Sequence, residues 1–345
     1  MTQPITIVGG GLAGLALGIV LRSENIPVRV IESGAYPRHR VCGEFISGRG
    51  VSILKRLGVT ERWAHSSSGL AETVVFFDER ARWFSSHLRE PAVVIPRWNL
   101  DDSLAKQFEA AGGQLLLQTR WKEDFRSTGV VRAAGRRVSG SPGQWRWFGI
   151  KAHISGIHLE SDLELHCRPN GYVGICGLPN GRANVCGLFR RKEAWPELAK
   201  QWQDVLKGGP GTLLRDKLEH GEFDGATFCA VAGFSFERSF RADPREIRVG
   251  DALGMIPPVT GNGMSIAFES AEIAAHALLK YCRGEWNWDQ TAARAADAMD
   301  QAFRRRLYWA AVLQWLLFQP WAASTVKAWP RLARPLFVFF LEATR

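Results

Sequence analysis

The stretch ITIVGGGLAG, residues 5–14, decides the fold of the N-terminal region. Its first four residues form a continuous apolar, mostly β-branched run, which is typical of a buried parallel strand. Gly9, Gly11 and Gly14 follow in the pattern G-x-G-x-x-G, and residues 12–23 are predicted to form a helix. In this pattern the first glycine permits a tight turn, the second lets the backbone approach a pyrophosphate, and the third lets the helix pack on the strand. The spacing predicts a dinucleotide-binding β-α-β unit.

A second strand and an acidic residue complete this unit. Val28–Ile31 is predicted to be the next parallel strand, and it ends at Glu32, 18 residues after Gly14. A carboxylate at this place accepts hydrogen bonds from ribose hydroxyls and disfavours a 2′-phosphate, so FAD or NAD is expected rather than NADP. The N-terminus of the helix, at Leu12 and Ala13, offers free N–H groups and a partial positive charge to phosphates.

A second glycine-containing segment lies more than two hundred residues downstream. Residues 246–249 are predicted to be a strand that runs into GDALGMIPPVTGNGMSIAFESA, residues 250–271, with a helix from Met264 to about Lys280. Together with the first loop, and with Arg97 and Asp101 at a helix start, this segment resembles the FAD-dependent oxidoreductases that include para-hydroxybenzoate hydroxylase and the geranylgeranyl reductases. The resemblance covers most of residues 1–280.

The resemblance implies FAD as the cofactor and a role for individual residues. Asp251 would accept a hydrogen bond from a ribityl hydroxyl, and Gly261 and Gly263 would let backbone amides approach the flavin. The helix that follows would direct its positive end at the flavin edge where negative charge develops on reduction. Arg40 would serve the pyrophosphate, because a guanidinium suits phosphate geometry. The predicted FAD-binding residues are Gly9, Gly11, Leu12, Ala13, Gly14, Glu32, Arg40, Arg97, Asp251, Gly261, Asn262, Gly263 and Met264.

The segment RHRVCGEF, residues 38–45, favours the geranylgeranyl reductase-like members, which carry a Cys-Gly dipeptide on the loop that approaches the flavin. Cys42 and Glu44 are therefore the candidate catalytic residues. Glu44 is expected in a half-buried cleft, with a raised pKa and a proton to donate. The alternatives are a surface carboxylate paired with Arg40 or Arg49 and, for Cys42, a small packing residue.

Two features depart from related enzymes. Hydroxylases of this family carry an Asp-Gly pair that touches the flavin and a nicotinamide cofactor, but Ala134 stands at the expected aspartate here. Residues 118–138 also form a short segment that is expected to lack a hairpin. The electron donor is therefore left open between NAD(P)H and a reductase or ferredoxin-like protein. Flavin-dependent halogenases typically have W-x-W-x-I-P, which Trp145–Ile150 matches poorly, and we identify no equivalent of their catalytic lysine.

The fold class predicted is α/β, with a Rossmann-like FAD-binding domain, an inserted antiparallel β-sheet substrate domain and a helical C-terminal region. Strands at 162–167, 172–178 and 183–189 are joined by two Pro-Asn-Gly turns, with a helical stretch at 194–220. His153, His158 and His166 are interpreted as strand surface or pocket wall, and no metal site is expected. The predicted domains are residues 1–73, 95–144 and 241–285 for FAD, 74–94 and 145–240 for the substrate sheet, and 286–345 for a helical cap.

Composition limits the classes of function. The net charge of +10 attracts anions, but the basic residues are dispersed and accompany no DNA-binding motif, so no nucleic-acid partner is expected. The six cysteines form no C-x-x-C pair, and the N-terminus lacks a secretory pattern, so a cytoplasmic protein is expected. The C-terminal sixty residues are rich in tryptophan and arginine. They are interpreted as packing on the flavin domain or lining an apolar pocket, with peripheral contact to the inner membrane face as the alternative.

The predicted function is FAD-dependent redox chemistry on a hydrophobic prenyl, polyketide or aromatic metabolite, of the geranylgeranyl reductase type. The first alternative is a flavin monooxygenase that hydroxylates an aromatic or polyketide substrate. A flavin-binding partner protein with little turnover and a flavin-dependent halogenase are the others.

Overall fold

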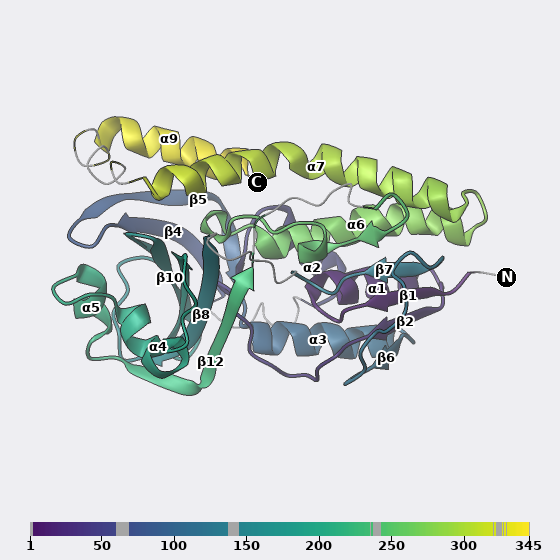
Figure 1. Cartoon of the computed structure of the whole chain (residues 1–345), viewed down its shortest axis with the longest axis horizontal. Coiled ribbons are helices and arrows are strands. Elements are labelled where there is room, and N and C mark those ends of the chain that lie inside the picture. Colours follow the sequence, from purple (N-terminus) through teal and green to yellow (C-terminus); the bar gives the residue numbers. More distant parts are fainter. Residues whose placement is uncertain are drawn as a thin grey trace.

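The computed structural model describes residues 3–59, 69–136, 145–234, 236, 243–319, 321, 326, 328 and 330–344. Two sheets stand side by side, and a layer of two helices runs along one long edge over both of them (Figure 1). This is the α/β fold expected, with a parallel nucleotide-binding sheet, a mainly antiparallel second sheet and C-terminal helices.

The first sheet is parallel and has the strand order β13-β7-β1-β2-β6. Its strands are β1 (Ile5–Val8), β2 (Val28–Ile31), β6 (Gln114–Leu116), β7 (Val130–Arg132) and β13 (Ile247–Arg248). The predicted pairing of the first two strands is confirmed. Between β6 and β7 the described residues contain no strand, in agreement with the missing hairpin.

Helices cover this sheet and bring distant segments together. They are α1 (Leu12–Ser23), α2 (Arg49–Arg56), α3 (Arg97–Ala110) and α6 (Gly263–Cys282). Helix α1 packs against both α3 and α6. A side chain at Gly18 would meet the Phe108 ring at 2.7 Å, so the absence of a Cβ allows the close approach of α1 and α3.

The second sheet has eight strands in the order β12-β8-β11-β10-β9-β4-β5-β3. Its pairs are antiparallel except for β4 with β9, which is parallel. The strands are β3 (Phe45–Ile46), β4 (Leu70–Phe77), β5 (Arg82–Val94), β8 (Arg146–Ser155), β9 (Leu163–Arg168), β10 (Gly171–Leu178), β11 (Arg182–Arg191) and β12 (Glu222–Phe234). The two predicted Pro-Asn-Gly turns connect β9, β10 and β11, with Asn170 and Asn180 at positive φ.

The two faces of this sheet pack against different helices. On β10, Val173 and Ile175 belong to an apolar cluster that includes residues of α4 (Leu198–Lys207) and α5 (Leu213–Leu218), while Tyr172 and Cys176 belong to another. The second cluster includes residues of α7 (Trp288–Leu317) and α9 (Pro330–Ala343). The alternation of side chains along a strand divides the core in this way. The division of the chain into three domains stays a prediction.

Candidate flavin site

Backbone contacts leave no room for a side chain at two of the three glycines of the first loop, Gly9 and Gly14. A Cβ at Gly9, which has φ +114°, would lie 2.2 Å from the carbonyl oxygen of Ala133, just after β7. A Cβ at Gly14 would lie 2.0 Å from the carbonyl oxygen of Gly9. At Gly11, in contrast, an added Cβ meets nothing within 4 Å, and no side chain caps the first turn of α1. The loop is therefore tightly packed against the backbone at Gly9 and Gly14 and open at Gly11, as a phosphate-binding turn requires.

Glu32 lies at the end of β2 and is connected to this loop. One carboxylate oxygen accepts the Gly10 N–H at 2.8 Å and lies 2.9 Å from the Arg38 guanidinium, and the other accepts the Gly34 N–H at 2.8 Å. Burial alone would raise the pKa of Glu32, but the Gly34 hydrogen bond and Arg38 outweigh it and lower the pKa. Glu32 is thus held as a carboxylate beside the glycine loop, where it can accept ribose hydroxyls.

The second predicted segment meets the first directly. Gly250, which has φ +61°, approaches α1 so closely that an added Cβ would lie 2.9 Å from the Cβ of Ala13. The next residue, Asp251, is the middle residue of a short 3-10 turn, η1 (Gly250–Ala252). Burial raises the pKa of Asp251, while the nearby charges of Arg136, Arg97 and Arg40 act in the opposite direction. Segments more than two hundred residues apart therefore form one continuous surface.

The N-terminus of α6 is also available to a ligand. The turn η2 (Pro258–Thr260) precedes Gly261, whose φ of +69° is left-handed. The Asn262 side chain does not cap the helix, because it donates to Thr344 at the C-terminal end of the chain and accepts from Ser47. Gly263 and Met264 form the first turn of α6, and their N–H groups can approach the flavin ring as the resemblance implies.

Two arginines lie close to Asp101 of α3. Arg97 forms a bidentate pair with Asp101, with both N–O distances at 2.9 Å. Arg40 lies 3.5 Å from Asp101 and 3.9 Å from Glu32. Bidentate pairing fixes the Arg97 guanidinium, whereas Arg40 is partly exposed and has no short ion pair among the described residues. Of the two, Arg40 fits the phosphate-binding role better.

These residues fit FAD. The glycine loop supplies a cradle for the pyrophosphate, Glu32 supplies a ribose acceptor, and α6 supplies an uncapped helix end. The structure places Asp251 near Ala13, Arg97 and Arg40, and the binding roles of the thirteen residues stay a prediction. Tyr36 is a further residue at this site, and no sequence motif indicated it. Its hydroxyl donates to the carbonyl oxygen of Gly10 and so lies over the glycine loop.

Glu44 is fully buried, in contrast to the half-buried cleft predicted for it. It adopts φ +61° and forms a cluster with two residues of β8, Lys151 and His153; we call these three residues the Glu44 cluster. Lys151 Nζ lies 3.0 Å from one carboxylate oxygen and His153 Nε2 lies 2.8 Å from the other. Burial alone would raise the pKa of Glu44, but the His153 hydrogen bond and the Lys151 charge lower it. The predicted raised pKa is therefore wrong.

Cys42 lies next to this cluster. Its Sγ is 3.4 Å from the Glu44 N–H, and its carbonyl oxygen accepts a 2.9 Å hydrogen bond from Asn184 of β11. Burial raises the pKa of the Cys42 thiol, so the sulfur is protonated and a poor nucleophile. The loop of residues 38–45 is thus attached to the second sheet at both Cys42 and Glu44.

His153 and His166 are buried polar groups rather than strand surface, whereas His158 is exposed. His39, Glu44 and His153 each direct one potential metal-ligand atom to a common point, within 4.8 Å of one another. The Lys151 ammonium already occupies this neighbourhood, 3.0 Å from Glu44 and 3.3 Å from His39 Nδ1. The lysine supplies the positive charge that a metal would bring, which disfavours metal binding here.

An apolar, aromatic cluster adjoins the flavin loop. Val259 of η2 is buried in the same cluster as Phe337 and Phe340 of α9, and Phe45 packs against it. The Phe45 ring fills the space above Gly261, where an added Cβ would lie 2.4 Å from it. The sequence predicted that the C-terminal aromatic residues pack on the flavin domain or line an apolar pocket; they pack mainly on the second sheet, where Phe337 contacts Phe76 and Phe84.

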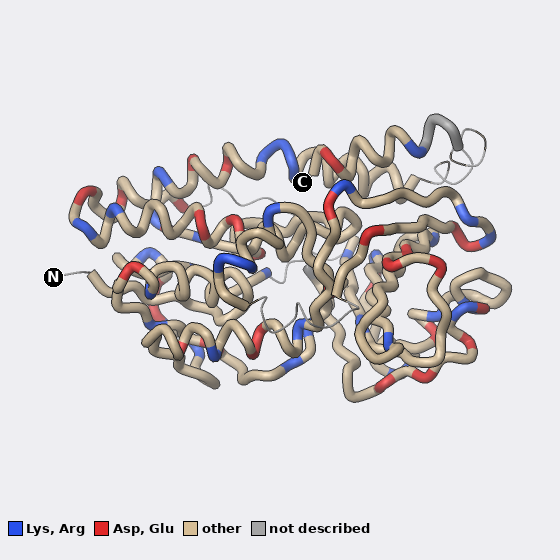
Figure 2. Tube along the Cα trace, turned by 180° about the vertical axis from the view of Figure 1, so that it is seen from behind, with Lys and Arg blue, Asp and Glu red and all other residues tan. Residues whose placement is uncertain are grey.

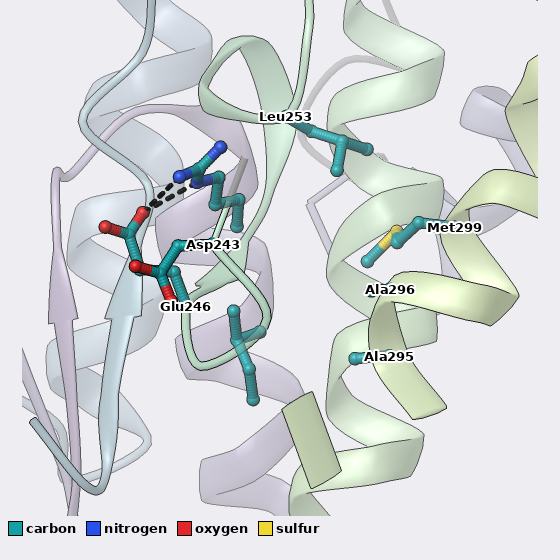
Figure 3. Close-up of a pocket in the computed structure, with 8 residues that line it drawn as sticks. Asp243, Glu246, Leu253, Ala295, Ala296 and Met299 are labelled. Atoms are coloured by element: carbon teal, nitrogen blue, oxygen red, sulfur yellow. Dashed lines mark hydrogen bonds and ion pairs between the residues drawn. The ribbon is translucent and has the colours of Figure 1, made fainter. Parts of the chain in front are cut away.

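A small cavity lies elsewhere, between β13 and α7 (Figure 3). Arg248 and Glu246 form an ion pair at 2.6 Å on one side, and Leu253 and Met299 lie on the other. It has room for about one water molecule. This cavity is too small for an organic ligand and does not contact the first glycine loop.

Comparison with known proteins agrees with this geometry. Residues 2–132 match the family described as FAD binding domain. The N-terminal region thus resembles FAD-binding domains of this family, and FAD is the cofactor of the protein. The narrower resemblance to para-hydroxybenzoate hydroxylase and the geranylgeranyl reductases is not confirmed by these matches.

The whole chain has the fold of flavin-dependent monooxygenases and halogenases. It superposes on the flavin-dependent brominase Bmp2 with a TM-score of 0.74 and 18% identity, over 99% of this chain and 94% of the other. It also superposes on pqsL of Pseudomonas aeruginosa, described as a probable FAD-dependent monooxygenase, with a TM-score of 0.68 and 16% identity. This match covers 94% of this chain and 100% of the other. Conditioned medium factor receptor 1 of Dictyostelium discoideum is 24% identical to this chain over 80% of its residues. The matched region covers 63% of the length of that relative.

Proposed function

We propose that the protein is an FAD-dependent monooxygenase that acts on an apolar organic molecule with an electron-rich ring or chain. In such a reaction one atom of O2 enters a C–H bond of the substrate and the other leaves as water, with uptake of two electrons and two protons. Bound FAD supplies the two-electron chemistry with O2. The observation that carries the proposal is the aromatic surrounding of the flavin loop at Val259 and Gly261.

An apolar environment favours oxygen transfer because it excludes water from the reacting groups. Phe45 covers Gly261, and Val259 is buried with the aromatic side chains of α9. A substrate that displaces these side chains from the loop would find apolar contacts and few polar groups. The same contacts predict a lipophilic substrate.

Reduction of a C=C bond, the function first predicted, needs a proton donor beside the flavin. The sequence offered Glu44 for this task. The lowered pKa and the contacts with Lys151 and His153 leave Glu44 ionised, so it acts as an acceptor. We therefore favour hydroxylation, in which the residues 38–45 position the flavin and substrate rather than deliver a proton.

Halogenation is less favoured by the same cluster. Flavin-dependent halogenases use a catalytic lysine. Among the described residues, the fully buried lysine beside the loop of residues 38–45 is Lys151, and its ammonium is paired with Glu44. The electron donor we propose is a separate reductase, because Ala134 stands after β7 where related hydroxylases carry the aspartate that meets the nicotinamide cofactor.

The test uses the FAD-loaded protein under anaerobic conditions, with NADH, NADPH and dithionite as reductants in turn. We expect dithionite to bleach the flavin. We expect NADH and NADPH to reduce it at least ~100-fold more slowly than they reduce the flavin of nucleotide-specific hydroxylases. This factor corresponds to an activation free energy that is ~2.7 kcal/mol higher because the nucleotide is not positioned. Oxygen is then admitted with a panel of apolar aromatic compounds. A product that gains one oxygen atom supports the proposal. A product that gains two hydrogens without oxygen, or a halogen when bromide is present, would overturn it.

The FAD site itself is tested by Asp251→Ala. Loss of a hydrogen bond to a charged group costs about 1.5–3 kcal/mol, so we expect FAD affinity to fall roughly ten- to hundredfold. Asp243→Ala is the matched control, since this aspartate pairs with Arg126 at the surface. Flavin fluorescence quenching on titration of the apoprotein measures both. Equal affinity in the two variants would remove Asp251 from the site.

A further inference from the structure

Large apolar side chains are exposed on the outer side of the helical layer. Tyr308 and Trp315 of α7 are 53% and 59% exposed, and Leu336 and Phe339 of α9 are 54% and 45% exposed. We call these four residues the aromatic patch. Exposed apolar side chains that occur singly need no explanation, but a contiguous group of them indicates an interaction site.

The members of the patch are neighbours. Tyr308 and Trp315 are seven residues apart on α7, and Leu336 and Phe339 are three apart on α9, so each pair lies on one side of its helix. Trp309 joins the two helices, with its ring centroid 5.2 Å from that of Tyr308 and 5.4 Å from that of Phe339. The patch therefore extends across both helices.

These side chains adjoin the buried face of α9. Phe337 and Phe340, whose mean direction is about 100° from that of Leu336 and Phe339 around the helix axis, fill the apolar cluster beneath the helices and are almost fully buried. The apolar surface of α9 is thus wider than the face that packs on the sheet, and the remainder of it faces outward. A helix that only covers a sheet would carry polar residues on its outer side.

Positive charge surrounds the patch. Arg304 and Arg305 lie on α7 one turn before Tyr308, and Arg334 is exposed on α9 beside Leu336. The acidic groups nearby are Asp300, which pairs with Arg304, and Glu342 on α9. From residue 304 to the end the sequence has seven Lys or Arg and one acidic residue. In Figure 2 this layer carries blue segments on either side of long tan stretches.

We propose that the aromatic patch docks the protein on the surface of an anionic lipid bilayer, with α7 and α9 lying in the plane of the interface. Tryptophan and tyrosine combine an apolar ring with a polar group and suit the headgroup region, and arginines add attraction to anionic lipids. No helix in the described part of the chain is long and apolar enough to cross a membrane. The proposed contact is therefore peripheral, and it does not depend on the proposed function.

The charge pattern favours a bilayer over a second copy of this chain. Two copies joined through the patch would bring the arginines of both α7 helices close together, with like charges facing each other. An anionic lipid surface instead neutralises them. A lipophilic substrate dissolved in the bilayer would also meet α9, whose inner side belongs to the cluster beside the flavin loop.

The test is co-sedimentation of the FAD-loaded full-length protein with vesicles of phosphatidylcholine, with and without phosphatidylglycerol. The variant is Trp315→Glu with Leu336→Glu. The matched control is Leu117→Glu with Leu213→Glu, which alters two leucines that are 39% and 36% exposed outside α7 and α9 and changes the net charge equally. Flavin content and molecular mass in solution are measured for all three proteins.

We expect the unaltered protein and the control to bind the anionic vesicles. We expect the patch variant to bind at least ~10-fold more weakly, because it loses the burial of two large apolar side chains in the bilayer. Salt weakens the binding without abolishing it. Absence of binding by the unaltered protein, or an equal loss in both variants, would overturn the proposal. So would a dimer in solution that the patch substitutions dissociate, because the patch would then join two copies of the chain.

Discussion

The second sheet contains two buried clusters of the same composition on its opposite faces. In the Glu44 cluster the carboxylate contacts Lys151 and His153 at 3.0 and 2.8 Å. In a second cluster, formed by Glu164, His166 and Lys217 and here called the Glu164 cluster, the carboxylate contacts the lysine at 2.8 Å and the histidine at 3.0 Å. Both carboxylates have lowered pKa values despite burial, which alone would raise them.

Position distinguishes the two clusters. Glu44 lies on the loop that leads from the FAD-binding sheet, and His153 is 109 residues away on β8. Glu164 and His166 are two residues apart on β9, and Lys217 comes from α5, which packs on the same sheet. The first cluster therefore joins the two sheets beside the flavin site, whereas the second supports one sheet from behind. The same side chains can serve ligand positioning in one place and local stability in another.

The largest effect is expected from removing each carboxylate. Glu44→Ala leaves Lys151 charged and fully buried, which costs about 3–5 kcal/mol of the free energy of unfolding. Glu164→Ala should cost less, about 1–3 kcal/mol, because the Lys217 side chain is 12% exposed and also reaches Glu160 at 3.6 Å. Urea denaturation of both variants measures the difference. A larger cost for Glu164→Ala would contradict the distinction drawn between the clusters.

A double replacement sharpens the comparison. Glu44→Gln with Lys151→Met removes both charges and leaves no buried charge unpaired. The double variant should therefore lose about 1–3 kcal/mol less of the free energy of unfolding than the two single variants lose together. The corresponding cycle for Glu164 and Lys217 should give a coupling below ~1 kcal/mol, because water reaches that lysine. Four urea titrations per cycle determine each value. Equal couplings would mean that the burial of Lys151 has no special consequence.

A smaller effect is expected from pH. Burial lowers the pKa of His39 from 6.5 to about 4, and burial also lowers the pKa of His166. Each histidine is neutral when folded and protonates more readily when unfolded, so its contribution is complete above pH 6.5 and is lost at lower pH, for His39 as pH falls toward 4. The lowered pKa values of Glu44 and Glu164 add a further loss only below about pH 4.5.

His39→Gln and His166→Gln should each reduce the loss of stability between pH 6.5 and 4. His39 should account for more of it, since burial lowers its pKa to about 4, whereas the Glu164 hydrogen bond opposes the lowering of the pKa of His166. Denaturation midpoints across this range give the comparison. A midpoint that begins to fall well above pH 6.5, or that falls equally in both variants and the unaltered protein, would show that other groups control acid stability.

The sequence predicted the flavin-binding elements well because their signals are local. The glycine spacing of residues 9–14, the acidic Glu32 and the glycines around Asn262 each specify a turn or a helix end. The structure places them as expected. The contact between Gly250 and Ala13 was not predicted, because the resemblance implied only that both segments bind FAD and no local pattern joins them.

The environment of Glu44 was not predicted because its partners are distant in the sequence. Lys151 and His153 alternate with apolar residues on β8; from the sequence, His153 is expected as strand surface or pocket wall, and Lys151 is not singled out. The loop of residues 38–45 covers that side of β8, as the Asn184 hydrogen bond to Cys42 shows. The sequence pattern that could have indicated a buried ion pair is Lys151 between two apolar neighbours, Ile150 and Ala152.

The most direct test of the proposed monooxygenase activity follows the fate of oxygen. The FAD-loaded protein is reduced with dithionite and mixed with ¹⁸O2 in the presence of 4-hexylresorcinol, a probe with an electron-rich ring and an apolar tail. Hydrogen peroxide and products are then measured per flavin. We predict that the probe lowers the peroxide yield and that the product contains one ¹⁸O atom. An unchanged peroxide yield with no labelled product, for this probe and for every apolar compound of the panel, would contradict the assignment.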